Sequence, residues 1–231
     1  MQRGRHCECG GNLLAHGSLI DGGRMKFADR VERISPSQTL AITNRVLELK
    51  RRGEDVIGLG AGEPDFDTPE HIKEAAIRAI REGKTKYTQS TGIPELKEAI
   101  TERFFQDYDV RYSPEQVIVS CGAKHSLANA VFSVADRGDE VIIFSPYWVT
   151  YPELVKLAGA NPVVVPANAQ DGFAIDLERL RRAITPKTRA ILFNNPVNPT
   201  GVLYGEESLA GLADLVANED LYLIADEIYA K

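Results

Sequence analysis

The sequence predicts an α/β fold in which a mostly parallel sheet is covered by helices on both faces. From residue 117 onward, short apolar runs alternate with amphipathic helical segments, and small or polar residues follow each apolar run. A helix between two strands returns the chain to the same end of the sheet, so successive strands lie parallel. Strands are expected at 117–119, 140–144, 162–165, 190–193 and 221–225.

The helices are predicted from apolar spacing and from start and stop residues. Ser37 precedes a helical pattern that Gly53 ends, and Thr68 with Pro69 forms a cap and first turn. Pro94 begins another helix in the same way. A short strand is expected at 56–59, and the later helices at 124–135, 151–157, 177–183 and 206–217.

The composition argues against a nucleic-acid-binding, membrane-spanning or secreted protein. Acidic and basic side chains, 33 and 27 with a net charge of -6, are interspersed, which argues against a nucleic-acid partner. The sequence has no apolar run long enough to cross a membrane and no secretory signal at its start. Three cysteines fit a reducing compartment, so we expect a cytoplasmic protein.

Residues 1–24 show neither helical nor strand periodicity, and we expect them to be a disordered leader. His6, Cys7 and Cys9 would make half of a metal site, but no second Cys or His pair follows at a matching spacing. No metal is therefore expected.

The turn after the 117–119 run is a candidate anion site. Gly122 and Ala123 are small enough for a ligand to approach the backbone, and the first amides of the following helix can bind an anion. Lys124 adds a full positive charge, so a phosphate would suit the turn. The alternative is a glycine needed only for a tight turn.

Three further candidates follow the later strands. Trp148 could stack on a flat ring or could cap the core. Asn198 stands before Pro199 in a loop whose two Asn-Pro pairs force sharp turns, and one X-Pro bond there could be cis. Asp226 ends an apolar strand, where a protonated pyridine nitrogen would offset its desolvation; a helix N-cap is the alternative.

Together these motifs resemble those of the class I pyridoxal-phosphate-dependent aminotransferases, in particular the bacterial aspartate aminotransferases. The resemblance runs from about Met25 to Lys231. It rests on Gly62 in A-G-E-P-D-F, Tyr87 in K-Y-T, Gly122 in G-A-K, Trp148 in S-P-Y-W, Asn198 in N-P-T-G, and Asp226 and Tyr229 in D-E-I-Y.

The resemblance implies a three-layer α/β sandwich of fold type I and a homodimer that holds pyridoxal 5'-phosphate between its subunits. Residues 25–68 would belong to the small domain and 69–231 to part of the large, cofactor-binding domain. The implied activity moves an amino group between an L-amino acid, of the aspartate or aromatic type, and a 2-oxo acid.

For the cofactor, the resemblance implies that Gly122, Ala123 and Lys124 lie at the phosphate. Trp148 would stack on the pyridine ring and also border the substrate. Asp226 would pair with the ring nitrogen and keep it protonated.

The remaining positions are implied to reach the ring oxygen, the substrate or the other subunit. Asn198 and Tyr229 would hydrogen-bond the ring oxygen, and Asn198 would also bind the substrate carboxylate. Gly62 would line the substrate pocket through its backbone. Tyr87 would reach the phosphate of the neighbouring subunit.

The sequence departs from the family at its end. In the family the cofactor forms a Schiff base with a lysine beyond the D-x-x-Y motif, and Lys231 stands too close to Tyr229 to be that lysine. We therefore expect a truncated chain that is inactive by itself; transamination by the 231 residues would prove this wrong. The alternatives are another reaction on the same fold, such as carbon-sulfur lysis, or a non-catalytic truncated paralogue.

Overall fold

The computed structural model describes residues 27–60 and 62–230, and a parallel sheet of four strands lies at its centre. The strand order is β2-β1-β3-β4, and all three pairings are parallel, which confirms the predicted fold class. The strands are β1 (Glu140–Ser145), β2 (Asn161–Pro166), β3 (Thr188–Asn194) and β4 (Tyr222–Asp226).

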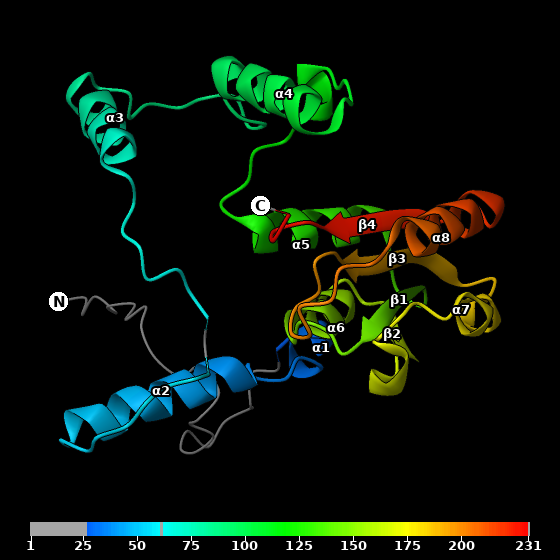
Figure 1. Cartoon of the computed structure of the whole chain (residues 1–231). Helices are drawn as coiled ribbons and strands as arrows, with labels where there is room; N and C mark the ends of the chain where they lie inside the picture. The colour runs from blue at the N-terminus through cyan, green and yellow to red at the C-terminus, as the bar shows by residue number, and fades with distance from the viewer. Residues whose placement is uncertain (1–26, 61, 231) are drawn as a thin grey trace, which may run out of the picture.

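Helices cover both faces of this sheet and complete three layers (Figure 1). Successive residues of a strand point to opposite faces, so Val141 and Ile143 join one core cluster while Ile142 and Phe144 join the other. The first cluster is closed by α5 (Ala123–Val134) and α6 (Thr150–Leu157), the second by α7 (Leu177–Ala183) and α8 (Glu206–Asn218).

The helices before residue 117 lie outside these layers. Figure 1 shows α2, α3 and α4 standing apart from the sheet, and none of them has a buried residue. Their ends follow the sequence signals: the Ser37 hydroxyl accepts a bond from the N–H of Leu40 at 3.3 Å, and Pro94 opens α4. The bounds are α1 (Asp29–Glu32), α2 (Gln38–Arg51), α3 (Glu70–Arg81), α4 (Pro94–Tyr108), and the short 3-10 helices η1 (Pro114–Gln116) and η2 (Ala169–Asp171).

Two of the predicted strands are wrong. Residues 56–59 and 117–119 are irregular, because a strand must pair with another strand and neither run does so in the described chain. The N–H of Val119 instead donates to the carbonyl of Thr91 at 3.0 Å. An apolar run therefore gave a false strand signal at both places.

The predicted leader, 1–24, with His6, Cys7 and Cys9, lies outside the described residues. The proposed division at residue 68 into small-domain and large-domain segments stays a prediction. In the described ranges the helices are too short or too polar to span a bilayer.

Candidate functional site

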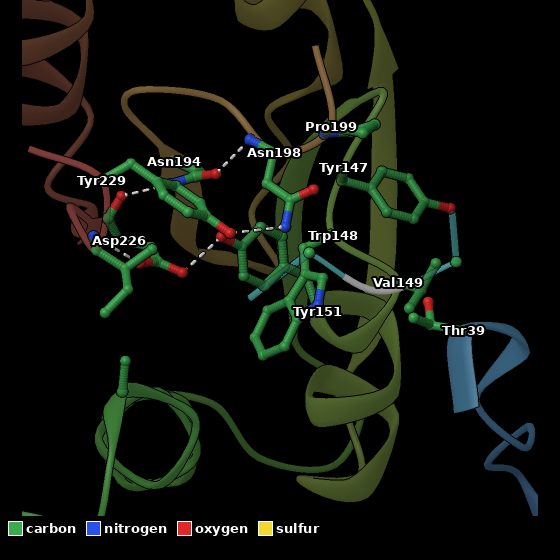
Figure 2. Close-up of a pocket in the computed structure, with 14 residues that line it drawn as sticks. Thr39, Tyr147, Trp148, Val149, Tyr151, Asn194, Asn198, Pro199, Asp226 and Tyr229 are labelled. Atoms are coloured by element: carbon green, nitrogen blue, oxygen red, sulfur yellow. Dashed lines mark hydrogen bonds between the residues drawn. The ribbon is translucent and has the colours of Figure 1, made fainter. Parts of the chain in front are cut away.

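A cavity of about 460 Å³ opens at the carboxyl ends of β1, β3 and β4, where ligands of parallel α/β sheets bind (Figure 2). Its size lies in the range of small-molecule sites. It is lined by Thr39, Gly60, Gly62, Ala123, Tyr147, Trp148, Val149, Tyr151, Asn194, Asn198, Pro199, Asp226, Ile228 and Tyr229.

Asp226 is the acid of this cavity, and the end of β4 places it there. It pairs with Asn194 in the β3–β4 register and is only 7% exposed. One carboxylate oxygen, Oδ2, accepts the Tyr151 hydroxyl at 2.7 Å, and the other, Oδ1, accepts the N–H of Ile228 at 3.2 Å. The carboxylate is thus held by one side-chain donor and one backbone donor.

The loop after β3 is tied to the same acid through Asn194 (Figure 2). Its side-chain Nδ2 donates to the carbonyl of Asp226 at 2.7 Å, while its Oδ1 accepts the N–H of Asn198 at 2.6 Å. Asn198 in turn donates through Nδ2 to the Tyr229 hydroxyl at 3.2 Å. The bonds before Pro196 and Pro199 are both cis, where the sequence suggested one.

The aromatic wall is formed by Trp148, which lies just before α6, and by Tyr151 in the first turn of that helix. Trp148 and Tyr151 meet edge to face, with ring centroids 5.6 Å apart and planes at 87°. Burial raises the pKa of Tyr151, and its hydrogen bond to Asp226 raises it further. The phenol therefore keeps its proton and acts as a donor.

The start of α5 faces the cavity through Ala123. Gly122 precedes the helix with a φ of 95°, a conformation that favours glycine. The backbone N–H groups of Ala123 and Lys124 donate to no other group in the described chain, as expected of a first helical turn. The Lys124 ammonium lies 4.9 Å from the centre of the Trp148 ring. Free amides and a cation thus stand at one edge of the cavity.

Most of the residues singled out in the sequence come together here. The lining includes Gly62, Ala123, Trp148, Asn198, Asp226 and Tyr229, and Gly122 and Lys124 adjoin it. Tyr87 does not: it is fully exposed in the segment between α3 and α4. Its expected reach to a neighbouring subunit stays a prediction.

Several lining residues were missed by the sequence analysis. Asn194 could have been found, since it directly follows the strand predicted at 190–193. Tyr151 follows Trp148 by three residues and begins the helix predicted at 151–157, so its nearness to Trp148 could have been noticed. Thr39 comes from α2, far earlier in the chain, and no local pattern predicts its contribution.

No cluster of three His, Cys, Asp or Glu side chains able to hold a metal occurs in residues 27–60 and 62–230.

Comparison with known proteins identifies the family. Residues 54–231 match the family model described as aminotransferase class I and II. The chain belongs to this family.

Within the family it is similar to aspartate aminotransferases. It is 52% identical over 203 residues to a probable aspartate/prephenate aminotransferase of Thermus aquaticus, covering 88% of this chain and 53% of that protein. It is 53% identical over 207 residues to an aspartate aminotransferase of Bacillus subtilis, covering 90% and 53%. The chain thus spans about half the length of these curated relatives.

Solved structures agree with this assignment. The aspartate aminotransferase from Thermus thermophilus, solved with maleate, superposes with a TM-score of 0.86 at 50% identity. The match covers 89% of this chain and 54% of that one. The α/β sandwich is therefore of the aspartate aminotransferase type.

Proposed function

We propose that the whole protein is a pyridoxal-phosphate-dependent transaminase that moves an amino group between an L-amino acid and a 2-oxo acid. The observation that supports this most is the placement of Asp226. It is a buried carboxylate that shares one cavity with Trp148, Asn198 and Tyr229. Acid, flat aromatic wall and hydrogen-bonding groups together suit a phosphorylated pyridine.

The groups around the cavity fit that cofactor part by part. Asp226 would hold the proton on the ring nitrogen, since the attraction between opposite charges offsets their desolvation. Trp148 would cover one face of the ring and exclude water from it. Asn198 and Tyr229, already 3.2 Å apart, would hydrogen-bond the ring oxygen. When bound, pyridoxal phosphate supplies a ring that accepts electrons from the substrate.

The phosphate would lie at the start of α5. There the unbonded N–H groups of Ala123 and Lys124 and the positive end of the helix favour an anion. The small Gly122 leaves the backbone accessible, and the Lys124 ammonium neutralises charge. This chain would therefore bind both ends of the cofactor.

For the substrate, we infer amino donors of the aspartate or aromatic type, because similar proteins are described as aspartate or aspartate/prephenate aminotransferases. Gly62, Trp148 and Asn198 line the part of the cavity that would receive it. The complete protein is proposed to be a cytoplasmic homodimer, with Tyr87 of one subunit at the phosphate of the other.

Cofactor binding by the 231-residue chain tests the proposal, and Trp148 is a built-in probe because it is the single tryptophan. We expect pyridoxal 5'-phosphate to quench its fluorescence at saturation. Asp226→Asn should weaken binding about tenfold, because a neutral amide cannot hold the ring proton. Asp214→Asn, at an exposed position of α8, is the matched control and should bind normally.

The absence of quenching at millimolar cofactor, or equal affinity of the Asp226 variant, would overturn the assignment. The activity itself is tested on the complete protein by following amino transfer from aspartate to a 2-oxo acid. Release of another product, such as one formed by carbon-sulfur lysis, would replace the proposed reaction.

A further inference from the structure

Tyr151 links the two parts of the site that would hold a pyridine ring. Its hydroxyl donates to Asp226 Oδ2 at 2.7 Å, and its ring meets Trp148 edge to face. The side chain is only 2% exposed, so water does not compete for either contact. One buried side chain therefore contacts both the acid and the aromatic wall.

The Tyr151 hydroxyl constrains the orientation of the Asp226 carboxylate through its hydrogen bond. Rotation of a carboxylate about its last bond is soft, and its orientation must be set by its donors. Here the donors are the backbone N–H of Ile228 on Oδ1 and the Tyr151 hydroxyl on Oδ2. The backbone donor is part of the chain turn after β4, so the phenol is the side-chain donor that sets the orientation.

The phenol can fill this role across the ordinary pH range. Burial and the neighbouring carboxylate both raise the pKa of Tyr151, which keeps the hydroxyl protonated. The protonated hydroxyl donates its hydrogen bond to Asp226 Oδ2.

We propose that Tyr151 is a positioning residue that aims the Asp226 carboxylate and steadies Trp148 for a flat aromatic ligand with a ring nitrogen. The inference rests on the proposed function, since it specifies how the same site recognises the pyridine nitrogen. Tyr151 itself would not touch the reacting atoms. It acts through Asp226, and its removal should therefore change selectivity for the nitrogen more than affinity in general.

Two probes separate these effects in the 231-residue chain: pyridoxal 5'-phosphate and its 1-deaza analogue, in which carbon replaces the ring nitrogen. Quenching of Trp148 gives the Kd of each. We expect the wild-type chain to prefer pyridoxal 5'-phosphate by about tenfold or more, as a charged hydrogen bond allows. In Tyr151→Phe this preference should fall about tenfold, while the affinity for the analogue stays within about twofold.

Tyr204→Phe is the matched control. Tyr204 is also buried, at 8% exposure, but it packs in the core cluster on the opposite face of the sheet. Burial alone raises its pKa, and its hydroxyl has no hydrogen-bond partner in the described chain. The control should keep the preference for the ring nitrogen.

A double-mutant cycle completes the test. In the Asp226→Asn background, Tyr151→Phe should leave the preference unchanged, because the phenol acts only through the acid. Thermal melts of each variant set a temperature at which all are folded.

The outcomes separate the two claims. If the wild-type chain binds neither probe, or binds both equally, the proposed function fails and this inference fails with it. If the wild-type preference is present and Tyr151→Phe retains it, or loses affinity for both probes alike, only the positioning role is overturned.

Discussion

The two regions of the described chain, 27–116 and 117–230, both form helices where apolar residues recur at helical spacing, but their apolar side chains differ in burial. Every buried apolar side chain lies between Leu127 and Leu215, in the second region. In the first, α3 is strongly amphipathic, yet Ile72 and Ile80 on it are exposed. Amphipathic spacing thus predicts that a helix forms, but not what covers its apolar face.

The candidate site draws on both regions unequally. The second provides the acid, the aromatic wall and the first turn of α5, each fixed by the packed sheet. The first contributes Thr39, Gly60 and Gly62 at the edge of the cavity. The acid, the aromatic wall and the first turn of α5 thus all lie in region 117–230, where packing fixes the orientation of side chains.

The largest expected effect compares one isoleucine from each region. Ile143→Ala, at 1% exposure, should lower the free energy of unfolding by about 2–5 kcal/mol, since it leaves a cavity in the core. Ile80→Ala, at 66% exposure, should change it by less than about 0.5 kcal/mol. Urea unfolding measures both, and equal losses would break the comparison.

A second experiment asks how firmly the regions are joined. Gly92 has a φ of 108°, and a Cβ there would come within 2.6 Å of Val119. Gly92→Ala should therefore destabilise by roughly 1–2 kcal/mol from the backbone alone, with the clash added. Gly83→Ala, with a φ of 74° and open space around it, carries only the backbone cost. Urea unfolding of the two variants gives the contribution of the contact, and identical values would mean that the regions are not coupled there.

A third experiment uses alkaline pH to probe the buried region. The pKa of Tyr151 is raised above its ordinary value of about 10, so its stabilising effect is complete below pH 10 and is lost as the pH rises further. Stability should fall by roughly 1 kcal/mol per pH unit from this residue alone. Tyr151→Phe should flatten the decline seen in urea unfolding, whereas Tyr108→Phe, in exposed α4, should not. A decline unchanged by Tyr151→Phe would contradict the assignment.

The smallest effect is expected in region 27–116, where no apolar side chain is buried. The Lys73 ammonium and then the N–H of Thr68 lower the pKa of Asp67. Lys73→Ala should raise this pKa toward the usual value, as read from the carboxyl carbon by NMR, with no measurable change in unfolding. A loss of stability would show that the exposed region depends on more than its local contacts.

The four strands of the sheet could be predicted from the sequence because each depends on a short-range pattern. The apolar run at 221–225 leads directly to Asp226, and strand ends of a parallel sheet meet at one edge. Pairing partners are not local, however, so the run at 117–119 was wrongly predicted as a strand. Tyr151 was missed for a related reason: its importance lies in a hydrogen bond to a residue 75 positions away.

The pairing of Asn194 with Asp226 at the ends of β3 and β4 has a consequence for how this protein can change. Side chains alternate between the two faces of a sheet, so inserting or deleting one residue within β4 would turn the carboxylate toward α7 and α8. Loops near the cavity can vary in length, but a change in the length of this strand would remove the acid from the cavity. The residue count of β4 is therefore as much a determinant of the site as the identity of its acid.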